Sequence, residues 1–346
     1  MIKAEIIADS LNEFGNRITT FVITFPRIIL AEFNTHRMFS RNSASSRAIP
    51  FPKMVEAVQK NPFIPLKWMM DHKGMQGNQY FDQVRSDMCE HEWLKTRDMV
   101  IDQAEILNKG IGLTKQMANR LLEPWMYHTA IVTATEYENF FALRAEGGAE
   151  IHIQKLAEEM LYAMNESQPR QLRAGEWHIP YGDQIDETEL SKVLPEFPPP
   201  DAVYKWRAAM DQAILKVATA RCAQVSYTVI GEDGKAMDYA KLIALHDRLA
   251  KAGHWSPFEH CARSMRKSEF MNNFTRRTVG ESDVTKRMLM EDDAGTGALV
   301  YSSSDPETAK PLWYQEYGWL GNFRGFIQYR KMFENENRSD SRLIKA

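Results

Sequence analysis

Residues 35–47, THRMFSRNSASSR, carry the densest set of groups in the chain that could bind an anion. Arginine side chains bind phosphate oxygens through two parallel hydrogen bonds, and serine hydroxyls and loop amides complete such sites. The segment follows an apolar stretch at 18–32, which would present it at the end of a strand. The composition therefore predicts an anion-binding loop, with a solvated polar loop as the plain alternative.

A second group, HWSPFEH at residues 254–260, combines a proline with several hydrogen-bonding side chains. Pro257 would fix a turn, leaving His254, Ser256 and Glu259 to offer donors and acceptors to a cofactor. The two histidines of the segment flank this turn at a spacing that matches no common zinc motif. We therefore expect a cofactor contact here and no metal site.

Three shorter stretches of the chain mix arginine, acids and apolar residues. They are RLLEP at 120–124, NFFALR at 139–144 and AEIHIQ at 149–154. Each of them alone is typical of an ordinary amphipathic helix. They indicate a function only when they are considered together with residues 35–47 and 254–260.

Together these blocks resemble the flavin-dependent thymidylate synthases over roughly half of the chain. Residues 36–47 are similar to the family signature R-H-R-x-x-S-x-N-E-x-S-x-R, and 254–260 to H-x-(S/T)-P-F-E-H. The three shorter stretches resemble A-R-x-x-L-P, N-F-L-x-L-R and A-Q-x-E-I-(R/Q). The family places the histidine–proline block first, whereas here it comes last, so the order indicates a circular permutation with insertions at 53–112 and 262–346.

The resemblance implies an α+β fold with a central, mainly antiparallel sheet flanked by helices. It also implies a homotetramer with active sites at subunit interfaces. Its members move a methylene group from 5,10-methylenetetrahydrofolate to C5 of dUMP; reduced FAD supplies the hydride and NADPH reduces the flavin. We expect a deoxynucleoside monophosphate as substrate and no need for a cysteine nucleophile.

Carried over residue by residue, the resemblance assigns roles to positions in each block. Arg144 and Ser45 would be catalytic. Flavin contacts would come from His254, Ser256, Glu259, His36, Arg37 and Asn139. Nucleotide phosphate would be held by Ser45, Arg47 and Arg120. The base would be recognised by Arg144, with Glu32, Thr35 and Ser43 as further substrate-binding positions.

The chain departs from the family pattern on the substrate side. Thr35 stands for the first Arg of R-H-R and Ser43 for the Glu after Asn, while Glu32 and Glu150 stand where the family carries Gln. A carboxylate only accepts hydrogen bonds, which suits the amino group of cytosine better than O4 of uracil. The alternatives therefore are the same chemistry on dCMP, as methylation or hydroxymethylation, and a non-catalytic flavin- or nucleotide-binding homologue.

The elements that must position these groups follow from apolar patterning. Residues 2–8 and 18–32 are predicted as strands, with Pro26 ending or edging the second, and 34–50 as a polar loop. Helices are predicted at 85–108, 114–122, 135–145, 149–165, 202–226 and 237–252, with a short aromatic helix at 322–333. Residues 293–306 are expected to form an exposed loop, and 263–300 give no clear pattern.

Bulk composition sets the remaining limits. The 346 residues suggest two parts, 1–193 and 202–346, joined by the proline-rich linker LPEFPPPD at 194–201 and forming one catalytic unit. A net charge of −3 disfavours nucleic acid and anionic membranes as partners. With no apolar leader, no membrane-length run and three scattered cysteines, we expect a cytoplasmic protein.

Overall fold

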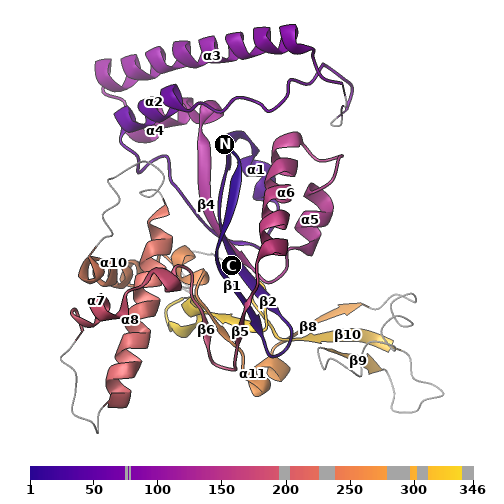
Figure 1. Ribbon diagram of the computed structural model, residues 1–346, viewed down its shortest axis with the longest axis vertical. Helices are drawn as coiled ribbons and strands as arrows, with labels where there is room; N and C mark the ends of the chain where they lie inside the picture. Colours follow the sequence, from indigo (N-terminus) through magenta and orange to yellow (C-terminus); the bar gives the residue numbers. More distant parts are fainter. Residues whose placement is uncertain are drawn as a thin grey trace, which may run out of the picture.

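The computed structural model describes residues 1–74, 77, 79–194, 203–225, 238–278, 297–301 and 311–336. Its centre is a five-stranded sheet in the order β3-β4-β2-β1-β5 (Figure 1). All neighbouring strands are antiparallel except β1 and β5, which are parallel. The strands are β1 (Lys3–Asn12), β2 (Arg17–Pro26), β3 (Ser40–Ser43), β4 (Tyr127–Ala134) and β5 (Arg170–Leu172). The predicted α+β class with a mainly antiparallel sheet is confirmed.

The core on one face of this sheet explains why the strands form. Phe21, Ile23 and Phe25 alternate along β2 and are fully buried, as the period of two along a strand requires. They pack against α5 (Glu138–Arg144) and α6 (Ile151–Glu166) through residues such as Phe140 and Leu156. The sheet and these helices form a rigid platform at whose edge β3 lies.

A helical layer covers one end of the sheet, drawn at the top of Figure 1. It consists of α2 (Phe51–Lys60), α3 (Gln83–Glu105) with a π-helical end η2 (Ile106–Gly110), α4 (Lys115–Leu121) and η3 (Glu123–Trp125). Trp93 joins the layer together, because its side-chain Nε1 donates to Phe63 O at 2.8 Å and its backbone oxygen accepts from Trp125 Nε1 at 3.1 Å. The segment 53–112, predicted as an insertion, is therefore mainly helical.

The second half of the chain has its own apolar cluster around Leu215, Leu242 and Phe258. Helices α8 (Val203–Ala223) and α10 (Tyr239–Ala252) enclose it, with α7 (Glu187–Ser191) and η6 (Ser256–Glu259) at its margin. Three small sheets complete the structure: β6 (Trp177–His178), β7 (Ala262–Ser264) and β13 (Phe326–Gln328); β8 (Phe274–Thr278), β9 (Gly297–Tyr301) and β10 (Pro311–Tyr317); β11 (Trp319–Leu320) and β12 (Phe323–Arg324). The short helical elements are η1 (Arg27–Ile29), α1 (Leu30–Phe33), η4 (Gly182–Gln184), α11 (Lys267–Asn272) and η7 (Tyr329–Met332).

Several sequence predictions need correction. The strand predicted for 18–32 stops at Pro26, which cannot donate to the ladder, and the chain turns into η1 and α1. The loop predicted for 34–50 contains the short strand β3, whose partner β4 lies far away in sequence. The aromatic helix predicted for 322–333 is wrong, because these residues pair as β12 and β13 before the single turn η7.

The six longer helix predictions are confirmed to within a few residues where the structure describes them. The predicted linker lies outside the described residues apart from Leu194, and the loop predicted at 293–306 does so apart from β9. Within the described part of the chain, no helix has the length and apolar content that crossing a membrane requires.

Candidate active site

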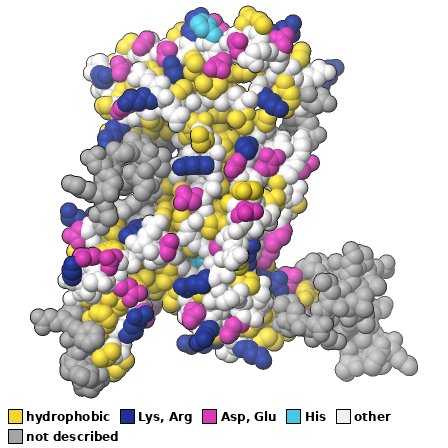
Figure 2. Space-filling model, in the orientation of Figure 1, with side chains coloured by type: hydrophobic (Ala, Val, Ile, Leu, Met, Phe, Trp, Pro, Cys, Tyr) yellow, Lys and Arg dark blue, Asp and Glu magenta, His cyan; other side chains and the backbone are white. Residues whose placement is uncertain are grey.

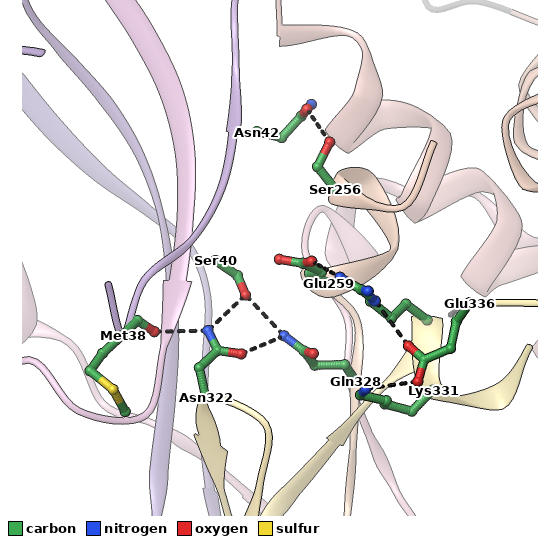
Figure 3. Close-up of polar contacts among 10 residues, drawn as sticks. Met38, Ser40, Asn42, Ser256, Glu259, Asn322, Gln328, Lys331 and Glu336 are labelled. Carbon is green, nitrogen blue, oxygen red and sulfur yellow. Dashed lines mark hydrogen bonds and ion pairs between the residues drawn. The ribbon is translucent and has the colours of Figure 1, made fainter. Parts of the chain in front are cut away.

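The two principal motifs of the sequence meet at the edge of the sheet. Asn42 on β3 accepts a hydrogen bond at Oδ1 from Ser256 Oγ of η6 at 3.1 Å (Figure 3). Its Nδ2 donates to Cys222 O at the end of α8. Gly253 ends α10 in the left-handed conformation (φ 74°) that favours glycine, and so directs the chain into η6. One amide thus holds the histidine–proline block against the arginine-rich loop.

A second contact joins the loop to the arginine helix. Arg144, at the end of α5, donates from Nε to His36 Nε2 at 3.1 Å. His36 is 9% exposed and packs edge-on against Phe140 with ring centroids 4.8 Å apart. Burial lowers the pKa of His36, and the charges of Arg144 and Arg41 lower it further. The imidazole is therefore neutral at pH 7, with the acceptor nitrogen facing Arg144 and the other nitrogen carrying the proton.

Glu259, the acid of the histidine–proline block, forms an ion pair with Arg330 of η7. Arg330 is held from its other side by Glu336, whose carboxylate also pairs with Lys331 at 2.7 Å. These attractions raise the pKa of Arg330 and outweigh its partial desolvation. The chain of charges fixes the position of the Glu259 carboxylate at the side of the site.

The C-terminal segment also reaches the arginine-rich loop directly. Ser40 Oγ, at the start of β3, accepts hydrogen bonds from Gln328 Nε2 at 2.9 Å and Asn322 Nδ2 at 3.0 Å. Asn322 also donates to Met38 O at 2.9 Å (Figure 3). The site is therefore built from three distant parts of the chain, namely 36–47, 254–260 and 322–336.

The last residue of the histidine–proline block is structural. His260 is fully buried and its Nδ1 lies 2.8 Å from Thr133 Oγ1 on β4. Thr133 continues a buried chain of hydrogen bonds across the sheet through Thr20 to His178. Burial lowers the pKa of both histidines to about 3, so they remain neutral. This chain anchors η6 to the sheet, and no metal-binding group of side chains occurs among the described residues.

Comparison with known proteins adds an independent observation. Residues 14–170 match the family described as thymidylate synthase complementing protein, or Thy1. The match covers somewhat less than half of the chain, and residues 14–170 are called the Thy1 segment below. It contains the arginine-rich loop and all three shorter blocks, so the suspected resemblance to thymidylate synthases of this kind is confirmed over these residues.

Solved structures similar to the chain include two of PolB, a UMP/dUMP methylase from Streptomyces cacaoi, bound with 5-Br UMP and with 5-Br dUMP. Each is 14% identical in sequence, with a TM-score of 0.40 over 48% of this chain and 89% or 90% of the PolB chain. No curated protein sequence matches the chain. The Thy1 match over residues 14–170 indicates that the chain is an enzyme.

The Thy1 segment presents its remaining predicted site residues largely to solvent. Those exposed are Arg37, Thr35, Ser43, Arg47, Arg120 and Asn139, together with His254 beyond the segment, whereas Glu32 and Ser45 are half-buried. Thr35 Oγ1 donates to the backbone oxygen of Glu32 at 2.7 Å. Arg47 and Arg120 make no ion pair with any described residue, so both guanidinium groups remain available to an anion.

Glu150, one of the two acids considered as acceptors for a cytosine amino group, already has partners within the protein. Glu150 caps the N-terminus of α6, where its carboxylate accepts from the backbone N–H groups of His152 at 2.9 Å and Ile153 at 3.1 Å and from the His152 ring. These hydrogen bonds lower the pKa of Glu150 despite its burial. Its acceptor capacity is used within the helix, so it is not a free partner for an amino group.

Several residues of the site were absent from the predicted set. Ser40, Arg41 and Asn42 lie inside the arginine-rich loop and could have been named from its composition. Asn322, Gln328 and Arg330 lie in the segment predicted as an extension, where no motif marks them. Only the folded chain brings them to Ser40 and Glu259.

The residues at this junction suit the flavin that the Thy1 resemblance implies. Ser256, Glu259 and His36 offer a hydroxyl, a carboxylate and a ring N–H, the donors and acceptors that a flavin ring edge requires. Asn42 joins the segments that carry them, because it lies in the arginine-rich loop and accepts a hydrogen bond from Ser256 of η6. The candidate cofactor site is therefore composed of residues from both halves of the chain.

Proposed function

We propose that the chain is a flavin-dependent enzyme that transfers a one-carbon unit from 5,10-methylenetetrahydrofolate to C5 of a pyrimidine deoxynucleoside monophosphate, with dUMP as the expected substrate and dTMP as product. The observation that carries this proposal is the hydrogen bond between Asn42 and Ser256, 214 positions apart. It joins two motifs that resemble separate parts of one family signature. Their contact is what a permuted but preserved site requires.

In this proposal the flavin is held by His254, Ser256, Glu259, His36, Arg37 and Asn139. When bound and reduced with NADPH, FAD supplies the hydride that completes the methyl group. The protein's own contribution is to bind the cofactor and the base next to each other in the orientation that the transfer requires. The neutral ring of His36 presents one donor and one acceptor nitrogen, which makes its hydrogen bonding to a ligand definite.

Nucleotide binding is assigned to the arginines of the site. Ser45, Arg47 and Arg120 would hold the phosphate. Arg144 is fixed through its Nε by His36, and its terminal nitrogens make no hydrogen bond within the described residues. Both are therefore free to donate to a pyrimidine carbonyl and to stabilise charge on the pyrimidine ring while the bond to C5 forms.

A cytosine nucleotide is the second candidate, supported by Glu32. Its carboxylate is half-buried on α1 and has no hydrogen-bond partner among the described residues. A free acceptor at this position would suit the N4 amino group of dCMP. The base would then receive either a methyl or a hydroxymethyl group.

The test is to incubate the protein with FAD, NADPH and 5,10-methylenetetrahydrofolate, separately with dUMP and dCMP, and to weigh the nucleotide products. A gain corresponding to one methyl group on dUMP is the expected result. Ser256→Ala, which removes the hydroxyl at the junction, should lower turnover, whereas Ser86→Ala on the distant α3 serves as the matched control. Bound flavin without any product would identify a non-catalytic homologue, and absence of both flavin binding and product would overturn the proposal.

A further inference from the structure

Arg41 occupies the centre of β3 between two anchored neighbours. Ser40 is fixed by Asn322 and Gln328, and Asn42 by Cys222 and Ser256. The backbone of Arg41 is paired in register with Val132 of β4. The backbone position of Arg41 is therefore fixed by the surrounding hydrogen bonds, and its side chain is half-buried.

The guanidinium group of Arg41 has more hydrogen-bond donors than the described residues satisfy. Its one hydrogen bond within the described residues runs from Nη1 to Phe33 O, at 3.3 Å. A guanidinium carries five N–H donors in a fork that matches phosphate oxygens. Most of the N–H donors of Arg41 therefore have no acceptor among the described residues.

The charge of Arg41 is also incompletely balanced. The carboxylate that attracts it, Glu259, is already in an ion pair with Arg330. Burial lowers the pKa of Arg41 in spite of that attraction, and Arg41 together with Arg144 lowers the pKa of His36. Arg41 and Arg330 therefore share the single carboxylate of Glu259, while Arg41 and Arg144 both lie near the neutral ring of His36. This excess of positive charge favours an anionic ligand.

The position where the family signature carries its first arginine cannot supply this charge. Thr35 is exposed and its hydroxyl is turned back onto the carbonyl of Glu32. Arg41 lies on the neighbouring strand, near enough to His36 to influence its ionisation. A cation is thus present at the junction although the aligned position has none.

We propose that Arg41 is a phosphate-binding residue of this site, contacting a phosphate ester either of the nucleotide or of the flavin dinucleotide. The proposal rests on the function proposed above and names a contact that the sequence resemblance does not supply. Both ligands present the same chemistry, a dianionic or bridging phosphate that accepts from a guanidinium fork. The experiment must therefore separate them.

The test compares wild type, Arg41→Gln and Arg41→Lys in titrations with FAD, riboflavin, dUMP, deoxyuridine and inorganic pyrophosphate. Arg41→Gln should weaken binding of one phosphate-bearing ligand by about 10- to 100-fold, the effect of removing one charge-assisted partner. Its counterpart without phosphate, riboflavin for FAD or deoxyuridine for dUMP, should bind as in wild type. If FAD binding weakens and riboflavin binding does not, Arg41 contacts the flavin phosphates; if dUMP binding weakens and deoxyuridine binding does not, it contacts the nucleotide phosphate. Arg41→Lys should restore only part of the affinity, because an ammonium group cannot donate two parallel hydrogen bonds as a guanidinium does.

Arg85→Gln, which removes one cation from the exposed α3, is the matched control and should bind every ligand as wild type does. Thermal melting of each variant checks that the fold is retained. Unchanged FAD, dUMP and pyrophosphate affinities in a folded Arg41→Gln would overturn the assignment of Arg41 while leaving the proposed function intact. Wild type that binds neither FAD nor dUMP would instead overturn the proposed function, and the assignment with it.

Discussion

Ser256 Oγ donates a hydrogen bond to Asn42 Oδ1 at 3.1 Å, and the Nδ2 of the same asparagine donates to Cys222 O. Asn42 therefore uses both ends of its amide to join β3, η6 and the end of α8. The two motifs that this contact unites belong to opposite halves of the chain, so the predicted parts 1–193 and 202–346 are joined at this point. Their separation into domains stays a prediction.

Asn42→Ala should destabilise the protein and reduce flavin occupancy. The change leaves Cys222 O without its donor, and losing a partner of this kind costs about 1–3 kcal/mol of unfolding free energy. Urea unfolding and the ratio of flavin to protein absorbance measure the two effects. Asn108→Ala, which removes one local hydrogen bond to Leu113 O in the helical layer, should lower stability without affecting flavin. Equal flavin loss in both variants would argue against a positioning role for Asn42.

Arg330→Met should weaken flavin binding more than Lys331→Met. Both residues pair with Glu336, but only Arg330 also holds Glu259. Without Arg330 the Glu259 carboxylate loses its fixed orientation beside the cofactor site. Flavin dissociation constants measured by fluorescence quenching should therefore separate the two variants, by roughly tenfold for one hydrogen bond to a charged group. Similar flavin dissociation constants for the two variants would show that the ion pair with Arg330 does not affect how Glu259 contributes to flavin binding.

The buried histidines predict sensitivity of the fold to acid. His178 and His260 have pKa values of about 3 in the folded state because of burial, against 6.5 when unfolded. Unfolding therefore takes up protons between these limits. The stability that depends on the neutral rings is fully present above pH 6.5 and is lost as pH falls toward about 3.

His260→Gln tests this dependence, since glutamine can still bond to Thr133 but cannot take up a proton. The slope of unfolding free energy against pH should decrease by about 1.4 kcal/mol per pH unit, the value for one proton. Denaturant titrations between pH 6 and pH 4 measure the slope. An unaltered slope would mean that His260 is already protonated in the folded protein.

Arg47→Ala should weaken nucleotide binding by roughly ten- to hundredfold, corresponding to ~1.5–3 kcal/mol for one charge-assisted partner. Arg47 is exposed, so the fold should be unaffected. Calorimetric titration with dUMP provides the affinity, and Arg173→Ala on the exposed turn after β5 controls for the general loss of positive charge. If a folded Arg47→Ala binds dUMP like wild type, the phosphate lies elsewhere.

Glu32→Gln distinguishes the two candidate bases. If the substrate is dCMP, wild type should prefer dCMP to dUMP, and the amide should reduce this preference because glutamine can donate as well as accept. Competition between the two nucleotides measures the ratio. A wild-type preference for dUMP that the substitution leaves unchanged would identify Glu32 as a structural acid and remove the support for a cytosine substrate.

Local patterns predicted much of the fold. The helices α3, α6, α8 and α10 follow from their apolar periodicity, and α6 begins at the acid that caps it, Glu150. Strand β3 could not be predicted, because its four residues, SRNS, have no strand-like pattern and are held by pairing with β4. The turn from Pro26 into η1 likewise depends on packing of Ile29 and Phe33 into the core.

The candidate site also contains residues that the sequence motifs predicted and residues that they did not. Motif spacing placed His36, Arg144, Ser256 and Glu259 in one site, and the structure connects each of them to a neighbouring motif or to a fixed partner. The supporting residues Asn322, Gln328 and Arg330 have no signature, since any donor of suitable length at the right place would serve. Their selection is a property of tertiary arrangement, which local sequence does not encode.

The hydrogen bonds from Asn322 and Gln328 to Ser40 span 282 and 288 positions of the chain, and this separation has a consequence for synthesis. At a translation rate of roughly 5–20 residues per second, β3 leaves the ribosome about a quarter of a minute to a minute before its partners exist. During that interval the nascent chain already contains the complete Thy1 segment, 14–170, but its Ser40 lacks both amide donors. We therefore expect the ligand-binding conformation to mature only after nearly the whole polypeptide has been made.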